Sequence, residues 1–453
     1  MVKNLEDTIT AIATPPGRAS MSVIRVSGKE AIPIVNRIFK GKNLELAAGH
    51  SLYYGRIVDP NTESMETIDT VMLALYRAPR SFTREDVVEI SCHGNPYILN
   101  RVIELLIHYG CRLAEPGEFT MRAFLNGRLD LAQAEAVADL IAANSSVSHK
   151  LAIHQLRGGY SKDLHQLRLK LLNFASLLEL ELDFSEEDVE FANRQELLEL
   201  IKGILAEIDS LILSFRAGNA IKNGIPTVIA GKPNVGKSTL LNALLNESRA
   251  IVSAIPGTTR DIIEDRLFLG GYEFRLTDTA GLRQTFDPIE EEGIRRSHEK
   301  IIASSILLYV FDPQIDTFAQ AQSEVENLKL PSTTQVVYVA NKIDLYPVAL
   351  PSSVISISAL IGTNLPLLKN ELVKIAQNLL QTDTVISNQR HLEALKRCHQ
   401  SLIAAQKGIE QSISSELVAI DIRHALHHLG EITGEVTTED ILENIFSKFC
   451  IGK

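Results

Sequence analysis

The strongest chemical signal in the sequence is a glycine-rich segment, residues 231–238, that reads Gly-Lys-Pro-Asn-Val-Gly-Lys-Ser. It has the G-x-x-x-x-G-K-S spacing of a phosphate-binding loop, and it lies between a predicted strand at 226–230 and a predicted helix at 239–245. Glycines let backbone N–H groups curl around phosphate oxygens, and the N-terminus of the following helix adds positive potential. In such a loop, Lys237 reaches the β- and γ-phosphates and Ser238 is a ligand of Mg²⁺. The segment therefore predicts binding of a nucleoside triphosphate.

Three later motifs narrow the choice of nucleotide. The motif Asp278-Thr-Ala-Gly281 ends a predicted strand, where the Asp can hold Mg²⁺ through water and the Gly amide can meet the γ-phosphate. The motif Asn341-Lys-Ile-Asp344 ends a later strand, and its last carboxylate can accept hydrogen bonds from guanine N1–H and the exocyclic amine, a donor pair that adenine lacks. Ser358 and Ala359 follow the next strand and can supply a backbone N–H to guanine O6. In this order, the motifs predict GTP rather than ATP.

Two further positions concern hydrolysis. The segment Gly-Thr-Thr-Arg-Asp at residues 257–261 lies between the phosphate loop and Asp278, and its Thr259 can complete Mg²⁺ coordination when the γ-phosphate orders the loop. Leu282 stands just after Gly281, where Ras-type enzymes carry the Gln that positions water. Another group must therefore orient the attacking water and stabilise the charge that develops.

Composition limits the remaining functions. The 453 residues carry 45 Lys and Arg against 56 Asp and Glu, a formal net charge of −11. Phosphate contacts need concentrated cationic side chains, so this balance argues against a surface that coats nucleic acid and leaves open a local basic pocket or an RNA site shared with a partner.

The four cysteines form no C-x-x-C pair, so we expect neither a disulfide framework nor a zinc site, and a reducing cytosol is the simplest setting. We also expect no signal peptide and no transmembrane helix, because no apolar run approaches about 18 residues.

The spacing of apolar residues predicts a multidomain scaffold with α/β and α parts. Residues 1–121 alternate short strands and helices, which predicts an N-terminal α+β domain. Residues 122–220 are rich in Leu, Ala and Glu at helical spacing, which predicts a helical bundle. Residues 221–378 predict a P-loop, Ras-like domain with a mostly parallel sheet. Helical spacing returns in residues 379–453, so we expect the P-loop domain to be inserted between two parts of a helical domain.

Individual elements follow from apolar runs bounded by Gly and Pro. In the N-terminal domain the predicted strands are 9–13, 22–26, 70–76 and 86–92, and the predicted helices are 31–39 and 96–109. In the inserted domain the predicted strands are 226–230, 272–277, 305–311, 335–340 and 354–357.

These motifs together resemble one family. The phosphate loop with Asn234, the Gly-Thr-Thr-Arg-Asp segment, the run Asp278-Thr-Ala-Gly-Leu-Arg283 and the C-terminal Cys450-Ile-Gly-Lys453 match the bacterial tRNA-modification GTPases of the MnmE family, also called TrmE. The resemblance extends over essentially the whole chain, including Thr14-Pro-Pro-Gly-Arg18 and the block at residues 116–135.

For the nucleotide site, the resemblance implies a GTPase activated by K⁺ and by the pairing of two G domains. A monovalent cation beside the β- and γ-phosphates can replace an arginine finger. The resemblance implies Asn234, Ser253, Ile255 and Thr258 as K⁺ ligands and Ser238 and Thr259 as Mg²⁺ ligands. The full predicted GTP-binding set is Asn234, Val235, Gly236, Lys237, Ser238, Thr239, Ser253, Ala254, Ile255, Pro256, Gly257, Thr258, Thr259, Asp278, Thr279, Ala280, Gly281, Asn341, Lys342, Asp344, Ser358 and Ala359.

The resemblance also assigns the catalytic role of orienting water to Glu290. Glu291 and Glu292 lie beside it and are the alternatives for the same role. From the residues alone, Glu290 would be an exposed carboxylate at the start of a helix.

For the N-terminal domain, the resemblance implies the folate-binding fold of glycine-cleavage T proteins, which binds 5-formyltetrahydrofolate or a related one-carbon folate and forms the homodimer. The matching positions are Arg25, Glu89, Arg128 and Lys453. A carboxylate such as Glu89 suits the pterin amine and ring N–H, and cations suit the glutamate tail of folate. Arg128 stands where the family usually carries Lys, which keeps the charge but changes the geometry. From the residues alone, Arg25 and Glu89 would be ordinary charges at strand ends.

Two other features leave alternatives open. Cys450, a predicted catalytic residue beside Lys453, is either a nucleophile activated by its surroundings or a small buried apolar residue. His424, His427 and His428 share part of a predicted helix face. Because the sequence indicates no carboxylate or Cys constellation around them, we expect them to be helix surface rather than metal ligands.

The resemblance implies a cytoplasmic homodimer that works with the flavoprotein MnmG, which carries FAD, in a heterotetramer that involves no membrane. Together they would form 5-aminomethyl or 5-carboxymethylaminomethyl uridine at wobble position 34 of tRNA. One alternative is a ribosome-assembly GTPase of the Era or Der type, which would not need the N-terminal block or the C-terminal motif. A second is a folate-dependent methyl carrier regulated by its G domain and acting on metabolites.

Overall fold

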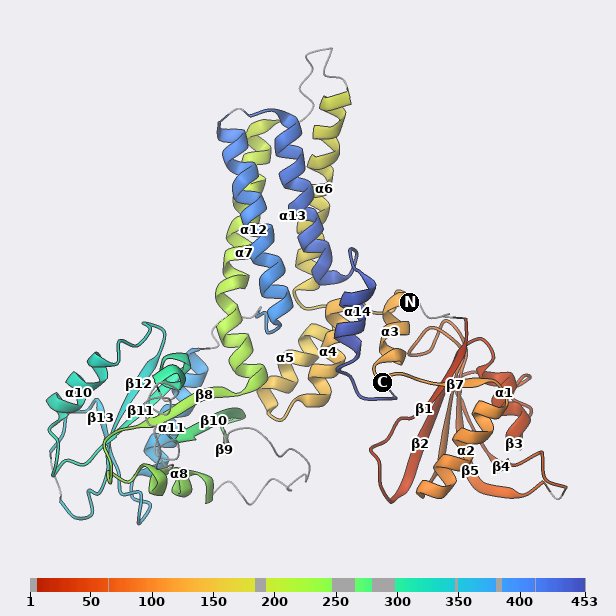
Figure 1. Ribbon diagram of the computed structural model, residues 1–453, viewed down its shortest axis with the longest axis horizontal. Coiled ribbons are helices and arrows are strands. Elements are labelled where there is room, and N and C mark those ends of the chain that lie inside the picture. The colour runs from red at the N-terminus through yellow and green to blue at the C-terminus, as the bar shows by residue number, and fades with distance from the viewer. Residues whose placement is uncertain are drawn as a thin grey trace, which may run out of the picture. The chain divides into compact units, whose positions relative to one another are not determined.

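The computed structural model describes residues 6–63, 65–183, 193–246, 265–278, 298–346, 349–379, 385–411 and 413–452. The chain divides into two compact units, each of which contains one β-sheet. The first unit comprises Met1–Ile141, Ile153–Leu205 and Ala394–Lys453, and the second comprises Ala142–Ala152 and Ala206–Glu393 (Figure 1). In the described part of the chain, no helix is both long enough and apolar enough to cross a membrane.

The first unit contains a seven-stranded sheet in the order β3-β4-β5-β6-β2-β1-β7. Its strands are β1 (Thr8–Ile12), β2 (Ala19–Ser27), β3 (Phe39–Lys40), β4 (Ser51–Val58), β5 (Thr67–Tyr76), β6 (Val87–Gly94) and β7 (Cys111–Leu113). All neighbours are antiparallel except β1 and β7, which are parallel. The register between β2 and β6 places Arg25 directly opposite Glu89. Tertiary pairing thus brings together two residues of the predicted folate site.

Two helices, α1 (Ala31–Ile38) and α2 (Pro96–His108), share a hydrophobic core with this sheet (Figure 1). The side chain of Asn95 caps α2 by accepting a hydrogen bond from the backbone N–H of Tyr97 at 2.9 Å. Leu99, Val102 and Leu106 recur at helical spacing and are buried against the strands. Burial of each such side chain contributes about 1.5–3 kcal/mol.

The rest of the first unit is helical, as the sequence predicts. Four helices belong to it entirely: α3 (Glu118–Leu125), α6 (Ser161–Asp183), α13 (Ser415–Thr433) and α14 (Glu439–Phe446). It also contains α4 (Leu131–Ala142) except for its last residue, and segments of α5 (Ser146–Leu156), α7 (Arg194–Asn223) and α12 (Gln389–Glu410). Helix α6 packs along α13 (Figure 1). It buries Leu164, Leu167, Leu171 and Leu178, whereas Leu172 is 41% exposed. Segments on both sides of the second unit in the sequence therefore build one bundle.

The second unit contains a six-stranded sheet in the order β13-β12-β11-β8-β10-β9. Its strands are β8 (Ile225–Ala230), β9 (Asp265–Leu269), β10 (Tyr272–Asp278), β11 (Ile306–Phe311), β12 (Gln335–Ala340) and β13 (Val354–Ser356). Only β9 is antiparallel to its neighbour. Helices α8 (Lys237–Asn246) and α11 (Leu365–Asn378) share one core with the sheet, and α10 (Phe318–Asn327) shares another. The mostly parallel α/β architecture predicted from the sequence is confirmed.

The strands that the sequence predicts are all present, within a few residues of their expected limits. Strands β3, β4, β7 and β9 were not predicted. Two of these, β3 and β7, are only two and three residues long. Strand β4 contains Gly55, and β9 begins Asp-Arg, so both depart from a clean apolar alternation.

Candidate functional site

The phosphate loop has the strand–loop–helix geometry that its sequence predicts. It leaves β8 after Ala230 and enters α8 at Lys237. Gly231, Asn234 and Gly236 all have positive φ, at 145°, 64° and 94°. A Cβ atom at Gly231 would lie 2.0 Å from the carbonyl oxygen of Val310, so only glycine fits there. A loop curled in this way directs backbone N–H groups toward an anion at the helix N-terminus.

The side chains at the start of α8 contact the phosphate loop and the end of β10. The ammonium of Lys237 donates to the carbonyl oxygens of Gly231 and Lys232 at 2.9 and 2.7 Å. The hydroxyl of Ser238 donates to a carboxylate oxygen of Asp278 at 2.7 Å, because β8 and β10 are adjacent parallel strands that end at the same edge. A hydroxyl and a carboxylate this close form a hard-oxygen donor set, which fits Mg²⁺.

The Asn341-Lys342 motif packs directly against the phosphate loop. The Asn341 amide donates to the carbonyl oxygen of Val235 at 2.8 Å and accepts from the backbone N–H of Ala359 at 2.9 Å. The ammonium of Lys342 donates to the carbonyl oxygen of Asn234 at 2.8 Å. The segment that carries Asn341 and Lys342 is thus hydrogen-bonded to the phosphate loop, although the two segments lie far apart in the sequence.

The structure also describes the residues predicted to recognise the base. Asp344 is exposed, whereas Ser358 and Ala359 are buried. The backbone N–H of Ala359 donates to Asn341, and the exposed carboxylate of Asp344 is open to N–H donors such as those at the edge of a guanine. Val235 is buried and Thr239 is exposed in the same loop–helix junction.

Sequence reasoning missed a residue that supports this junction. The carboxylate of Asp312 is 3% exposed and lies 2.9 Å from the ammonium of Lys342. Asp312 directly follows β11, a fully buried strand. Its position at the carboxyl end of a central parallel strand was the signal that could have found it.

Several predicted nucleotide residues lie outside the described residues. They are Ser253, Ala254, Ile255, Pro256, Gly257, Thr258, Thr259, Thr279, Ala280, Gly281 and Glu290. Of the predicted K⁺ ligands, the structure describes Asn234, whose side chain is exposed.

A second candidate site forms in the first unit, where the C-terminal tail meets the N-terminal sheet. The guanidinium of Arg25 donates to Glu89 at 2.8 Å and to the carbonyl oxygen of Gly452 at 3.2 Å. It also lies over the rings of Phe82 and Phe119, 5.7 and 5.6 Å from their centroids. Two of the predicted folate residues are therefore in contact, and the tail that carries Cys450 lies against one of them. Lys453 lies outside the described residues.

The start of α3 holds the tail in place. The backbone N–H of Gly117 donates to the carbonyl oxygen of Cys450 at 3.3 Å, and Pro116 forms an isolated bridge with Ile451. Cys450 itself is exposed, so the alternative that it is a buried apolar residue is wrong. An exposed sulfur on an anchored segment is accessible for chemistry.

Ion pairs around the buried side chains of Arg122 and Glu118 hold the first turn of α3. Arg122 is 1% exposed and bonds to Asp7 and to Glu118, the latter at 3.1 Å. Arg112 bonds to the same Glu118 at 2.6 Å. Burial by itself raises the pKa of Asp7, but hydrogen bonds from Arg112 and Arg122 lower it overall, so this carboxylate stays charged.

The fourth predicted folate residue, Arg128, lines a cavity of about 690 Å³. Arg80, Arg84 and Phe82 line the same cavity. Phe82 belongs to both places, because its ring also lies under the guanidinium of Arg25. Three guanidinium groups and an aromatic ring fit a flat, anionic ligand, which agrees with the donor set expected for folate.

The strand, phosphate loop and helix, together with the Ser238–Asp278 pair and the packed Asn341-Lys342 motif, define the class of P-loop nucleotide-binding proteins. Residues 131–450 match the family model of the MnmE helical domain. Residues 8–128 match the model of the GTP-binding protein TrmE N-terminus. The chain therefore belongs to the MnmE family of tRNA modification GTPases, and the resemblance seen in the sequence is confirmed.

Curated relatives named tRNA modification GTPase MnmE match this chain from end to end. The relative from Cytophaga hutchinsonii is 49% identical over 460 residues, with 100% of this chain and 99% of the relative covered. The relative from Christiangramia forsetii is 46% identical and covers 99% of this chain and 100% of its own length. The relative from Flavobacterium johnsoniae is 46% identical with 99% of both chains covered. Among solved structures, the G domain of the T. maritima FeoB iron transporter is 26% identical, covers 34% of this chain and 99% of its own, and has a TM-score of 0.26.

Proposed function

We propose that the protein is a K⁺-activated GTPase that acts with the flavoprotein MnmG to form 5-aminomethyl or 5-carboxymethylaminomethyl uridine at wobble position 34 of tRNA. The observation that carries the proposal is the junction at the phosphate loop, where Ser238 meets Asp278 and Lys342 meets Asn234. Membership of the MnmE family supports the link to tRNA. MnmG, with its FAD, would be the partner in a heterotetramer built on a homodimer of this chain in the cytoplasm.

The proposed division of labour follows the four segments expected from the sequence. Residues 1–121 would bind folate and form the homodimer, and residues 221–378 would be the G domain. Residues 122–220 and 379–453 would be the two parts of the helical domain, the second ending in the Cys450 motif.

In the G domain, each residue has a defined role. Lys237 would leave the two loop carbonyls that it now contacts and bind the β- and γ-phosphates, while backbone N–H groups of the loop hold the same oxygens. Ser238 and Thr259 would hold Mg²⁺ directly and Asp278 through water. When bound, the metal ions neutralise charge on the phosphate oxygens.

The groups that catalyse hydrolysis would differ from those of Ras-type enzymes. With Leu282 in place of a Gln, Glu290 would orient the attacking water. Asn234, Ser253, Ile255 and Thr258 would hold K⁺ where an arginine finger otherwise acts.

The tail site would serve the modification chemistry. Glu89 would accept hydrogen bonds from the pterin of a one-carbon folate such as 5-formyltetrahydrofolate, and Arg25, Arg128 and Lys453 would bind its carboxylates. Cys450 lies exposed next to this site and would act there as a nucleophile.

Three experiments test this function. Replacing K⁺ by Na⁺ should slow GTP turnover strongly, and equal rates in the two salts would contradict the cation role. Reconstitution with MnmG, GTP, folate and tRNA, omitting one component at a time, should lose the modified uridine at each omission when nucleosides are measured by mass spectrometry. Unaltered wobble uridines in a deletion strain would remove the tRNA assignment and favour an Era-like or Der-like switch.

A further inference from the structure

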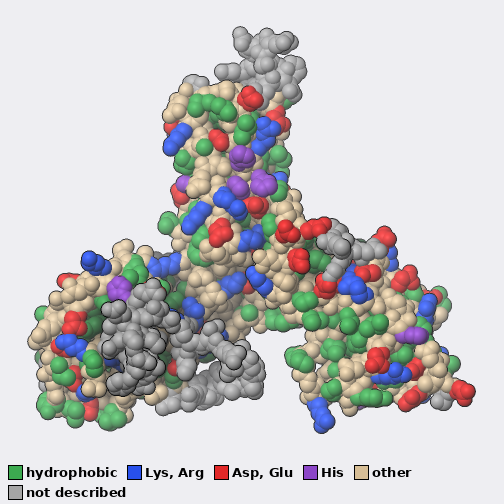
Figure 2. All heavy atoms as spheres, viewed as in Figure 1, with side chains coloured by type: hydrophobic (Ala, Val, Ile, Leu, Met, Phe, Trp, Pro, Cys, Tyr) green, Lys and Arg blue, Asp and Glu red, His purple; other side chains and the backbone are tan. Residues whose placement is uncertain are grey.

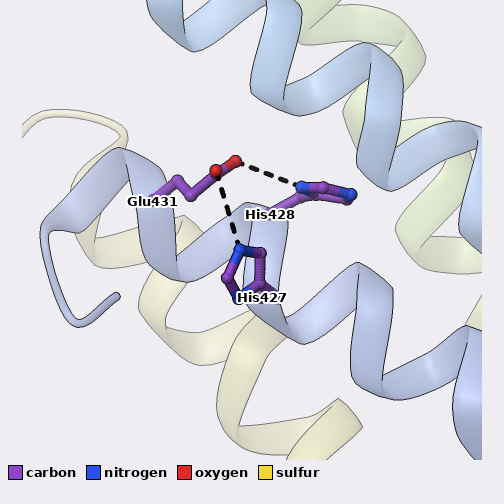
Figure 3. Close-up of side chains that lie close together, drawn as sticks. All are labelled: His427, His428 and Glu431. Atoms are coloured by element: carbon purple, nitrogen blue, oxygen red, sulfur yellow. Dashed lines mark hydrogen bonds and ion pairs between the residues drawn. The ribbon is translucent and has the colours of Figure 1, made fainter. Parts of the chain in front are cut away.

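One turn of α13 brings three potential metal ligands together. His427 Nε2 lies 3.7 Å from one carboxylate oxygen of Glu431, and His428 Nδ1 lies 3.1 Å from the other (Figure 3). One ligand atom from each residue lies within 4.8 Å of the other two. Both rings point toward the carboxylate from the same helix (Figure 3). The expectation that no carboxylate lies beside these histidines is wrong, because residues three and four positions apart share a helix face.

We propose that His427, His428 and Glu431 bind a divalent transition-metal ion of the Zn²⁺ class. Two ligands that each lie about 2.0–2.1 Å from a tetrahedral ion are separated by about 3.3 Å, from the geometry of the tetrahedron. His427 Nε2 lies 3.7 Å from Glu431 Oε1, close to that value, and one ligand atom of each residue lies within 4.8 Å of the other two. Two imidazoles and a carboxylate are the donor set that Zn²⁺ takes in its open sites, and hard cations such as Mg²⁺ disfavour it.

The surroundings support such a site. Arg397 of α12 donates to Glu431 Oε2 at 3.0 Å, which fixes the carboxylate while its other oxygen faces His427. A hydrogen-bonded carboxylate is a better oriented ligand. The side chains of Glu431 and His428 are 15% and 20% exposed, whereas that of His427 is 52% exposed.

These exposures describe a site with a closed side and an open side. The two more buried ligands would hold the ion against the helix, and the exposed His427 provides a path from solvent. Solvent molecules would take the remaining coordination positions. Figure 2 shows histidine side chains gathered on the helical bundle, the part of the chain to which α13 belongs.

Calorimetric titration of the full chain with Zn²⁺ alone tests the proposal. Because the exposed Cys450 thiol can also bind Zn²⁺, every protein in the set carries Cys450→Ser. The background protein should bind one ion per chain at the cluster. His427→Ala and Glu431→Gln should each weaken that binding at least tenfold. His424→Ala is the matched control, because His424 is an exposed histidine of the same helix outside the cluster, and it should leave the affinity unchanged.

A second measurement needs no substitution at the cluster. Diethylpyrocarbonate labelling read by mass spectrometry should modify His427 and His428 without metal, and saturating Zn²⁺ should protect both while His424 stays reactive. Three results would each overturn the proposal and leave the three residues as an ordinary hydrogen-bonded group. The first is no Zn²⁺ binding at micromolar protein, and the second is equal Zn²⁺ binding by the cluster variants and His424→Ala. The third is equal labelling of the histidines with and without Zn²⁺.

Discussion

The guanidinium of Arg25 donates a hydrogen bond to the carbonyl oxygen of Gly452 at 3.2 Å, so a strand near the start of the chain holds the tail at its end. The tail lies close to β1 as well, because a Cβ atom at Gly452 would lie 2.5 Å from the carbonyl oxygen of Ile12. Gly452 has a φ of 93°, a conformation that glycine adopts without strain. The position of Cys450 thus depends on the close packing of the Gly452 backbone against Ile12 of β1.

Gly452→Ala should therefore displace the tail from Arg25. Because Arg25 is proposed to bind folate, a guanidinium that has lost the hydrogen bond that positions it should bind folate roughly tenfold more weakly, as measured by calorimetry. Modification of tRNA should fall with it, while GTP turnover stays unchanged. Gly17→Ala is the control, because Gly17 also has positive φ, at 130°, but a Cβ atom there would meet nothing within 4 Å. Equal folate affinities for the two variants would show that the tail does not contribute to the site.

The four cysteines should react very differently with iodoacetamide at pH 8. Cys92, Cys111 and Cys398 are buried, and burial raises the pKa of Cys92 to about 11 and the pKa values of Cys111 and Cys398 to about 12. Their thiols therefore stay protonated in the native chain up to strongly alkaline pH. We expect one label per native chain, on Cys450, and four in urea, counted by mass spectrometry. More than one label on the native chain would contradict the described burial.

Cys450→Ser tests the chemical role of that exposed thiol. The substitution keeps a side chain of similar size but removes the thiol, which is the proposed nucleophile. We expect tRNA modification to be lost and GTP hydrolysis to remain. Full modification by the variant would exclude a chemical role for the thiol.

Lys342→Met should weaken GTP binding about tenfold or more. The ammonium of Lys342 joins the carbonyl oxygen of Asn234 to the buried carboxylate of Asp312, and its removal leaves that carboxylate without a charge partner at 2.9 Å. Lys374→Met is the matched control, because Lys374 is an exposed residue of α11 with a long contact of 3.6 Å to Glu371. GTP affinity is measured by filter binding or calorimetry. If both variants bound GTP as tightly as the native chain does, the contacts of Lys342 with Asn234 and Asp312 would not contribute to nucleotide binding.

Glu290→Ala should retain GTP binding and lose turnover. The carboxylate is proposed to orient water in the transition state and not to bind the nucleotide, so kcat should fall with little change in affinity. Glu291→Ala and Glu292→Ala serve as the register controls. A Glu290 variant that hydrolyses GTP normally, beside an inactive Glu291 or Glu292 variant, would move the role to the neighbouring residue.

Much of the fold could be predicted because its signals are local. The apolar runs that became β8 and β11 are buried strands of a parallel sheet, and such strands read as continuous apolar sequence. The helical spacing of Leu164, Leu167 and Leu171 likewise fixed which face of α6 is buried. Strand β9 was missed because an edge strand that pairs on one side needs no such run.

The sequence by itself determined the phosphate loop, the order of the nucleotide motifs and the family, since each depends on residues that lie close together along the chain. The tertiary structure alone decided that Arg25 meets both Glu89 and Gly452, and that Asp312 holds Lys342 against the phosphate loop. These contacts join segments that are distant in sequence, and strand register and helix packing select them. No local pattern of residue types encodes such pairings, because the free energy that fixes them comes from burying whole sheets and helices together.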